Sequence, residues 1–209
     1  MKLVLATGNQ GKVRELRTIL GDLNIEVYSL KDFPEVGEIV EDGATFTENA
    51  IKKAKVVAQV TNLVALADDS GLEVDFLDGA PGIYSARFAG EGKSDADNNE
   101  KLLALLREVP RDKRTARFRC VIAICTPSGQ VNAADGACEG IIGFEPKGDK
   151  GFGYDPLFYL PEYDQTFAEL DSGLKNKISH RGQALAKAKN VLAEVLKGVE
   201  VNNADWGSE

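Results

Sequence analysis

Residues 63–72 read Leu-Val-Ala-Leu-Ala-Asp-Asp-Ser-Gly-Leu, so that two adjacent carboxylates, Asp68 and Asp69, follow directly on an apolar run. The run predicts a buried strand that ends where Gly71 permits a turn. Because an ionised carboxylate is costly to bury unless a cation or hydrogen bonds compensate it, an acidic pair at this place indicates a metal ion or a proton to be handled. A surface turn of the Asp-Asp-Ser-Gly type is the alternative interpretation.

The pattern of apolar residues on both sides of this run alternates between strands and helices. It predicts strands over residues 2–7, 63–67, 117–126 and 130–139, the last two as a hairpin, and helices over 12–20, 45–60, 95–109 and 180–196. Glycine-rich segments separate these elements, and loops of this kind can gather along one cleft. No repeat and no long linker divides the chain, so we expect a single α/β domain with a mixed β-sheet and flanking helices over residues 1–197, and a frayed tail over 198–209.

Composition limits the possible classes of function. The 209 residues are 43% apolar and 28% charged, which suffices for one sizeable domain or two closely joined lobes. The net charge of −8 argues against a surface for duplex nucleic acid, because phosphate contacts need clustered Lys and Arg, so we expect any polyanionic ligand to be small and held locally. Cys120, Cys125 and Cys138 lack C-x-x-C spacing, which favours reduced thiols over disulfides or zinc.

No apolar run approaches the roughly 20 residues that a membrane span requires. The apolar start of the chain, residues 1–6, is too short for a signal peptide before Thr7 interrupts it. We therefore expect a cytoplasmic protein without a membrane partner.

The loop between the first predicted strand and helix reads Thr7-Gly8-Asn9-Gln10-Gly11-Lys12. Its glycines let backbone N–H groups approach a ligand, the helix N-terminus carries partial positive charge, and the lysine adds a full charge, so the loop is a candidate phosphate cradle. An ordinary strand-to-helix turn with an exposed lysine explains the spacing equally well. A Walker A loop is disfavoured, because it needs glycine where Ala6 stands and a hydroxyl where Val13 stands.

The segment 41–53 brings acids to a predicted helix start and lysines one turn further along. A solvated helix face explains Glu48 and Lys52 as an i,i+4 pair. Glu41 and Lys53 are functional candidates, because Mg²⁺ takes only one or two carboxylates, and Glu41 with Asp69 meets that requirement. Three acids, Glu38, Glu41 and Asp42, lie in this neighbourhood, and Glu41 is chosen by its distance to Gly43.

Two later segments hold further candidates. Residues 151–156 place Phe152 between glycines, where a base can stack on its ring, whereas Tyr154 is expected to be a core aromatic. Residues 175–182 hold the single histidine, His180, at a predicted helix start with Ser179 as a plausible N-cap. A lone histidine cannot build a zinc site, so by itself His180 reads as a surface or capping residue.

Together these segments resemble the Ham1/RdgB-like inosine triphosphate pyrophosphatase family, the noncanonical purine NTP pyrophosphatases. The resemblance covers nearly the whole chain. Each matching block is a weak signal alone, whereas the order and spacing of the blocks are specific to the family. The blocks are Leu5–Lys12, Thr45–Ala50, Ala67–Leu72, Gly79–Arg87, Phe152–Asp155 and Ser179–Gly182.

The resemblance implies a two-lobed mixed α/β fold around a nucleotide cleft, a homodimer, and a requirement for Mg²⁺. It implies hydrolysis of a nucleoside triphosphate such as ITP, dITP or XTP to the monophosphate and pyrophosphate, which removes deaminated purines from the nucleotide pool. By similarity, Asp69 is the general base, and Glu41 and Asp69 face the metal. The remaining matches contact the substrate. Those on the phosphate side are Thr7, Gly8, Asn9, Gln10, Gly11, Lys12 and Lys53. Those that lie mostly around the base are Ser70, Phe152, Gly153, Tyr154, Asp155, Lys175, His180 and Arg181.

The chemistry agrees with that assignment. Water attacking the α-phosphorus needs its proton removed and needs the charge on the leaving pyrophosphate neutralised, which Asp69 and the cations Mg²⁺, Lys12 and Lys53 supply. Donors facing a 6-oxo purine edge reject a 6-amino group, because the mismatch leaves buried donors unpaired. Two rival interpretations stay open: a related pyrophosphatase for modified pyrimidine or other nucleotides, and a noncatalytic nucleotide-binding regulator.

Overall fold

The computed structural model of the protein describes residues 2–204. Two compact units share these residues. Unit 1 takes in the described residues of Met1–Asp69, Val121–Asp135 and Gln183–Glu209, and unit 2 comprises Ser70–Cys120 and Gly136–Gly182. The long elements β3 (Val64–Val74), β4 (Thr115–Cys125) and α5 (His180–Ala204) continue from one unit into the other.

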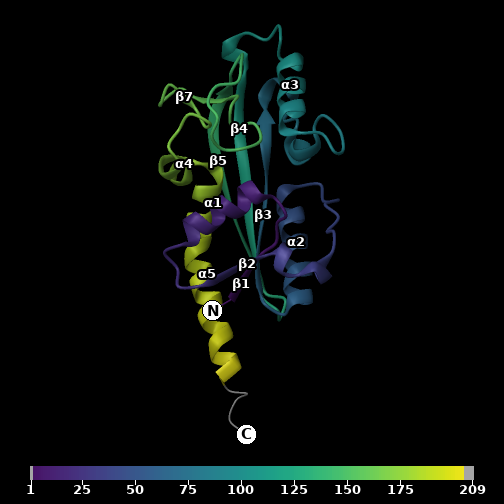
Figure 1. Cartoon of the computed structure of the whole chain (residues 1–209), viewed down its shortest axis with the longest axis vertical. Coiled ribbons are helices and arrows are strands. Elements are labelled where there is room, and N and C mark those ends of the chain that lie inside the picture. Colours follow the sequence, from purple (N-terminus) through teal and green to yellow (C-terminus); the bar gives the residue numbers. More distant parts are fainter. Residues whose placement is uncertain (1, 205–209) are drawn as a thin grey trace. The chain divides into compact units, whose positions relative to one another are not determined.

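The strands form one seven-stranded sheet in the order β2-β1-β3-β4-β5-β6-β7. Strand β1 pairs parallel with β2 and with β3, whereas β6 pairs antiparallel with β5 and β7. The sheet is therefore mixed and the helices flank it, which confirms the predicted fold class (Figure 1). The strands not yet delimited are β1 (Lys2–Leu5), β2 (Glu26–Ser29), β5 (Val131–Ile142), β6 (Phe158–Leu160) and β7 (Gln165–Thr166).

Unit 1 packs two amphipathic helices, α1 (Gln10–Leu20) and α2 (Phe46–Thr61). On α1 the apolar positions Val13, Leu16 and Leu20 are buried, as their spacing predicts. The start of α2 also follows the prediction, because Thr45 Oγ1 accepts a hydrogen bond from the backbone N–H of Glu48.

Unit 2 has its own apolar core, which includes Leu102, Phe118, Phe158 and Phe167. Its helices are α3 (Asp95–Leu105) and α4 (Ser172–Ile178). Short 3₁₀ helices complete the described chain: η1 (Leu30–Asp32), η2 (Pro34–Val36), η3 (Asp75–Leu77), η4 (Gly82–Arg87) and η5 (Arg111–Lys113).

Strand β3 corrects the prediction for the acidic pair. We expected the strand to end at Ala67, with a turn at Gly71, but β3 continues to Val74, so Asp68 and Asp69 lie in mid-strand. The alternative of a surface turn is wrong for the same reason. The sequence pattern indicated a strand end because the polar pair interrupts an apolar run. Only partners from other elements make this pair of acids suitable for the interior of a strand.

Helix ends differ from prediction in two places. Helix α3 ends at Leu105, before the expected Val109, and the backbone N–H groups of Arg107 and Val109 bond to carbonyl oxygens three residues earlier. Helix α5 continues through Ala204, although a frayed tail was expected from residue 198, and residues 205–209 lie outside the described residues. The predicted hairpin is confirmed as β4 and β5, closed by a hydrogen bond from Thr126 N to Gln130 O.

Candidate functional site

Unit 1 brings five ionisable side chains together, named here the lysine–carboxylate group: Lys12, Glu41, Lys53, Asp68 and Asp69. The Lys53 ammonium lies 2.8 Å from Asp69 Oδ1 and 3.1 Å from Glu41 Oε1, and it donates to the Asp68 carbonyl oxygen at 3.0 Å. Lys12 Nζ lies 2.7 Å from Asp68 Oδ1. Asp68 and Asp69 are 0% and 5% exposed, so the lysines compensate carboxylates that are buried.

Strand geometry explains why two adjacent acids need two lysines. Successive side chains leave a strand on opposite faces, so Asp68 and Asp69 point to opposite sides of β3. Lys12 from the first turn of α1 reaches Asp68, and Lys53 from the middle of α2 reaches Asp69. The local order of strand, loop and helix thus places one cation on each side.

The loop before α2 brings Glu41 to Lys53. Asn49, which is buried, accepts a hydrogen bond from Gly43 N at 2.8 Å through Oδ1 and so anchors the loop two residues after Glu41. A Cβ on Gly43 would lie 2.6 Å from that oxygen, which makes glycine necessary for the approach. Glu41 from this segment lies within hydrogen-bonding distance of Lys53, and its role toward a metal stays a prediction.

The other charged residues of this segment form contacts at the surface, but Glu48 and Lys52 bind other partners than each other. Lys52 Nζ pairs with Asp42 Oδ1 at 2.5 Å, and Glu48 Oε2 accepts from Ala44 N at 2.7 Å. The expected i,i+4 pair of Glu48 and Lys52 is wrong, because the backbone at the helix start competes successfully for the glutamate.

Electrostatics set the proton affinities within the group. Burial raises the pKa of the Asp69 carboxyl, and the charges of Lys53 and Lys12 oppose that rise. Burial disfavours the charged form of Lys53, yet the charges of Asp69 and Glu41 together raise the pKa of its ammonium. A carboxylate with a raised pKa accepts a proton more readily than an ordinary surface aspartate, which suits a general base.

The group fits a magnesium ion by the chemistry of its donors. Among residues 2–204, no three His, Cys, Asp or Glu side chains are grouped so that they could hold a metal by themselves. Glu41 and Asp69 nevertheless both reach the position of the Lys53 ammonium. Two carboxylates suffice for Mg²⁺, which completes its shell with water and phosphate oxygens.

Several polar groups in the loop of residues 7–12 form hydrogen bonds at the start of α1. Asn9 Oδ1 accepts from Gly11 N and Lys12 N at 2.8 and 3.1 Å, so Asn9 is the N-cap of the helix. Thr7 Oγ1 accepts from Asn9 N at 3.2 Å, and Gln10 Nε2 donates to Gly8 O at 3.1 Å. A Cβ on Gly8 would meet no atom within 4 Å, so the loop backbone is open there.

Unit 2 collects the second set of predicted residues around one aromatic ring. Lys175 Nζ and Arg181 Cζ lie 5.2 and 5.6 Å from the centroid of the Phe152 ring. Cations at this distance from a ring attract its face, and a planar base stacks on such a face. This set is named here the aromatic–cation group: Ser70, Phe152, Gly153, Tyr154, Asp155, Lys175, His180 and Arg181.

The polar members of the aromatic–cation group are buried and paired. Lys175 Nζ lies 2.5 Å from Asp155 Oδ2, and both side chains are less than one-tenth exposed. Asp155 Oδ2 also accepts from Phe152 N at 2.8 Å. Arg181, 1% exposed, donates from Nη2 to Ser70 Oγ at 3.0 Å. Such pairs hold donors in fixed places next to the ring.

His180 and Tyr154 are buried members of this group. We expected His180 to be a surface or capping residue, but it is buried and stacks on Phe118 with ring centroids 4.7 Å apart. Ser179 does cap α5, because its Oγ accepts from Gly182 N. Tyr154 is buried as expected, and its hydroxyl donates to Ser85 O at 2.8 Å; burial and the charge of Asp95 raise the pKa of that hydroxyl.

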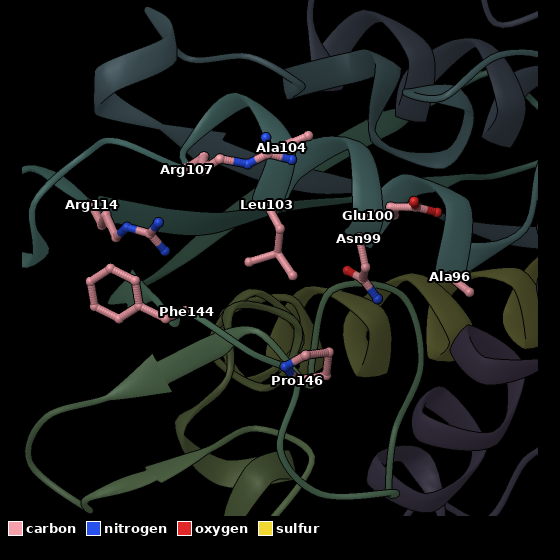
Figure 2. A pocket seen from close by; sticks show the side chains of 9 residues that line it. All are labelled: Ala96, Asn99, Glu100, Leu103, Ala104, Arg107, Arg114, Phe144 and Pro146. Carbon is pink, nitrogen blue, oxygen red and sulfur yellow. The ribbon is translucent and has the colours of Figure 1, made fainter.

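A cavity of about 600 Å³ lies elsewhere in unit 2 and holds none of the predicted site residues. One side of α3, with Asn99, Leu103 and Ala104, faces Phe144 and Pro146 across it (Figure 2). Arg114 closes one end, its guanidinium 3.9 Å from the Phe144 ring centroid. Despite its size, this cavity is therefore not the candidate site.

Sequence reasoning missed the residues that support the two groups. The Asn49 side chain binds the backbone of Gly43, and the side chains of Asp95 and Asn99 bind the backbone of Gly153. The Ser85 carbonyl oxygen accepts a hydrogen bond from the Tyr154 hydroxyl. No spacing rule signals such contacts, apart from the position of Asp95 and Asn99 one turn apart on α3. The three cysteines are free thiols, as their spacing predicts.

Comparison with known proteins agrees with the blocks of sequence identified above. The model of the Ham1 family matches residues 3–191. A dITP/XTP pyrophosphatase of Desulforamulus reducens is 63% identical over 96% of this chain and 100% of its own length, and one of Listeria monocytogenes is 54% identical over 95% and 98%. The structure of a HAM1 protein from Coxiella burnetii superposes with a TM-score of 0.83 at 45% identity, covering 93% of this chain and 99% of its own.

The fold and the two groups define an α/β protein with buried carboxylates and compensating lysines in unit 1 and an aromatic–cation group in unit 2. The chain belongs to the Ham1 family. Within residues 2–204 no helix is long and apolar enough to cross a membrane.

Proposed function

We propose that this protein hydrolyses noncanonical purine nucleoside triphosphates, ITP, dITP and XTP, to the nucleoside monophosphate and pyrophosphate. The observation that carries the proposal is the Lys53 ammonium held between the buried Asp69 and Glu41 carboxylates, in a chain whose relatives are dITP/XTP pyrophosphatases. Unit 1 supplies the groups that triphosphate chemistry needs, and unit 2 supplies those that a base needs.

In the proposed reaction a water oxygen attacks the α-phosphorus, and the bond from that phosphorus to the bridging oxygen of the pyrophosphate breaks. In this proposal the Asp69 carboxylate accepts the proton of the water. Lys12 and Lys53 leave their carboxylates in part to neutralise charge on the departing pyrophosphate. A Mg²⁺ ion on Glu41 and Asp69 supplies further charge neutralisation when bound.

The aromatic–cation group provides base recognition in this proposal. The base stacks on Phe152, and the buried donors of Lys175 and Arg181 face its 6-oxo edge. An adenine in the same place leaves such donors unpaired, and mismatches of this kind reject a substrate by about 10⁴–10⁵-fold. Clearance of deaminated purines from a cytoplasmic nucleotide pool, by a Mg²⁺-dependent homodimer, is the biological role that we propose.

A product assay tests the reaction. The purified protein is incubated with ITP, XTP, ATP, GTP or dUTP, with Mg²⁺ or EDTA, and pyrophosphate is resolved from orthophosphate. We expect Mg²⁺-dependent release of pyrophosphate from ITP and XTP and little from ATP or GTP. Turnover of dUTP instead contradicts the purine assignment, and binding without turnover indicates a regulator.

Isotope labelling tests where the water attacks. In water enriched with oxygen-18, attack at the α-phosphorus places the label in the monophosphate, because the pyrophosphate leaves with its original bridging oxygen. Mass spectrometry of both products reads the position of the label. Label in the pyrophosphate would refute the α-attack and with it the role proposed for Asp69.

Replacing Lys175 with alanine is expected to lower base discrimination more than phosphate affinity. The change removes a donor beside the Phe152 ring and leaves the buried Asp155 without its ammonium partner. We expect the ratio of kcat/KM for ITP to that for ATP to fall by about tenfold or more. The matched control is Lys177→Ala, an exposed lysine on the same helix. An unchanged ratio in a folded Lys175→Ala protein, checked by thermal melting, removes Lys175 from base recognition.

A further inference from the structure

Two side chains of helix α3 bind the loop that carries the Phe152 ring. Asp95 Oδ2 accepts a hydrogen bond from Gly153 N at 2.7 Å, and Asn99 Nδ2 donates to Gly153 O at 3.0 Å. The two side chains lie one helical turn apart, on the same face of α3. Both backbone polar groups of a single glycine are thus fixed by a second element of unit 2.

Gly153 is the position in the loop where these two hydrogen bonds have most effect on the backbone next to Phe152. Its φ of +61° is a conformation that side chains rarely adopt, and the residue stands between Phe152 and Tyr154. The Tyr154 hydroxyl is anchored on Ser85 O, and Phe152 N is anchored on Asp155 within the loop itself. The Gly153 contacts therefore set the backbone angle at which the Phe152 ring leaves the loop.

Helix α3 is a firm support for these contacts. Ser94 and Asp97, on either side of Asp95 in the sequence, form a reciprocal capping box at the start of the helix. These hydrogen bonds join the two residues to each other and not to Gly153. Asn98 ties the next turn to the preceding segment, because its Oδ1 accepts from Ala89 N at 2.7 Å. Leu102 is fully buried in the unit 2 core. The carboxylate of Asp95 also lies at the helix N-terminus, where the helix dipole favours negative charge.

We infer that Asp95 and Asn99 are positioning residues for base recognition, acting on Phe152 through the backbone of Gly153. The inference rests on the proposed function for the identity of the ligand. Because both residues bind a loop of the aromatic–cation group, we expect their loss to affect recognition of the base more than the phosphate chemistry. Asn99 lies on α3 with its amide directed away from the helix axis (Figure 2).

The kinetic test compares Asp95→Ala, Asp95→Asn and Asn99→Leu with wild type. We expect Asp95→Ala to raise KM for ITP about tenfold with kcat within about twofold of wild type, and to lower the ITP to ATP ratio of kcat/KM. Asp95→Asn retains an acceptor oxygen and so restores part of the preference. The matched control is Glu100→Gln, an acid-to-amide change at an exposed position of the same helix, which is expected to leave the ratio unchanged.

A second measurement does not depend on turnover. Hydrogen exchange followed by mass spectrometry is expected to show faster exchange in the peptide holding residues 151–155 for Asp95→Ala, but not for Glu100→Gln. Faster exchange with an unchanged nucleotide ratio overturns the role in recognition, and unchanged exchange overturns the grip itself. Failure of wild-type protein to hydrolyse ITP instead refutes the proposed function, and the exchange result still decides whether α3 holds the loop.

Discussion

Replacing Asp69 with asparagine is expected to lower kcat for ITP by about 10²–10⁴-fold, the usual contribution of a positioned general base. Asparagine has nearly the same shape and still accepts a hydrogen bond from Lys53, which lies 2.8 Å away. It cannot take up the proton of the attacking water. Nucleotide affinity is expected to stay close to that of wild type, because Lys12, Lys53 and the aromatic–cation group remain.

Binding is best measured by calorimetry with the α,β-imido analogue of ITP, since the bond between these two phosphates is the one that breaks. Glu73→Gln is the matched control: it is the same acid-to-amide change on the same strand, in a residue that pairs with Arg117 at the surface. We expect the control to keep turnover within about twofold of wild type. Near-normal kcat in Asp69→Asn removes Asp69 from the role of base, and lost binding assigns it to the substrate instead.

Replacing Arg114 with alanine is expected to destabilise unit 2 by about 3 kcal/mol or more. The guanidinium, in a residue that is 1% exposed, donates to the carbonyl oxygens of Leu106, Val109 and Gly143. Without it these buried acceptors lose their donor, and each costs about 1–3 kcal/mol. The Phe144 ring, whose face the guanidinium covers, also loses its packing partner (Figure 2).

Urea unfolding followed by circular dichroism measures this loss. Arg107→Ala, the same change in an exposed arginine that lines the same cavity, is expected to alter the free energy of unfolding by no more than about 0.5 kcal/mol. Arg114→Lys retains the charge but not the forked geometry, so it should recover only part of the stability. Equal stability of Arg114→Ala and Arg107→Ala would show that other groups satisfy the carbonyls.

Local rules account for much of the architecture. The apolar spacing on α1, the Thr45 cap of α2 and the hairpin of β4 and β5 were all predicted, because each depends on residues close together in sequence. The order of motifs also identified the family. The short elements β6, β7 and α4 were not predicted, since two to seven residues carry too little periodic signal.

The sequence by itself determined which residue types are available for chemistry: an acidic pair, a lysine in each of the first two predicted helices and an aromatic ring between glycines. Only the tertiary structure decided their partners. It placed Asp68 and Asp69 inside β3, paired each with its own lysine and buried His180 against Phe118. The physical reason is that a buried charge depends on compensation across space, from residues 12 to 56 positions away, and no local pattern encodes such a distance.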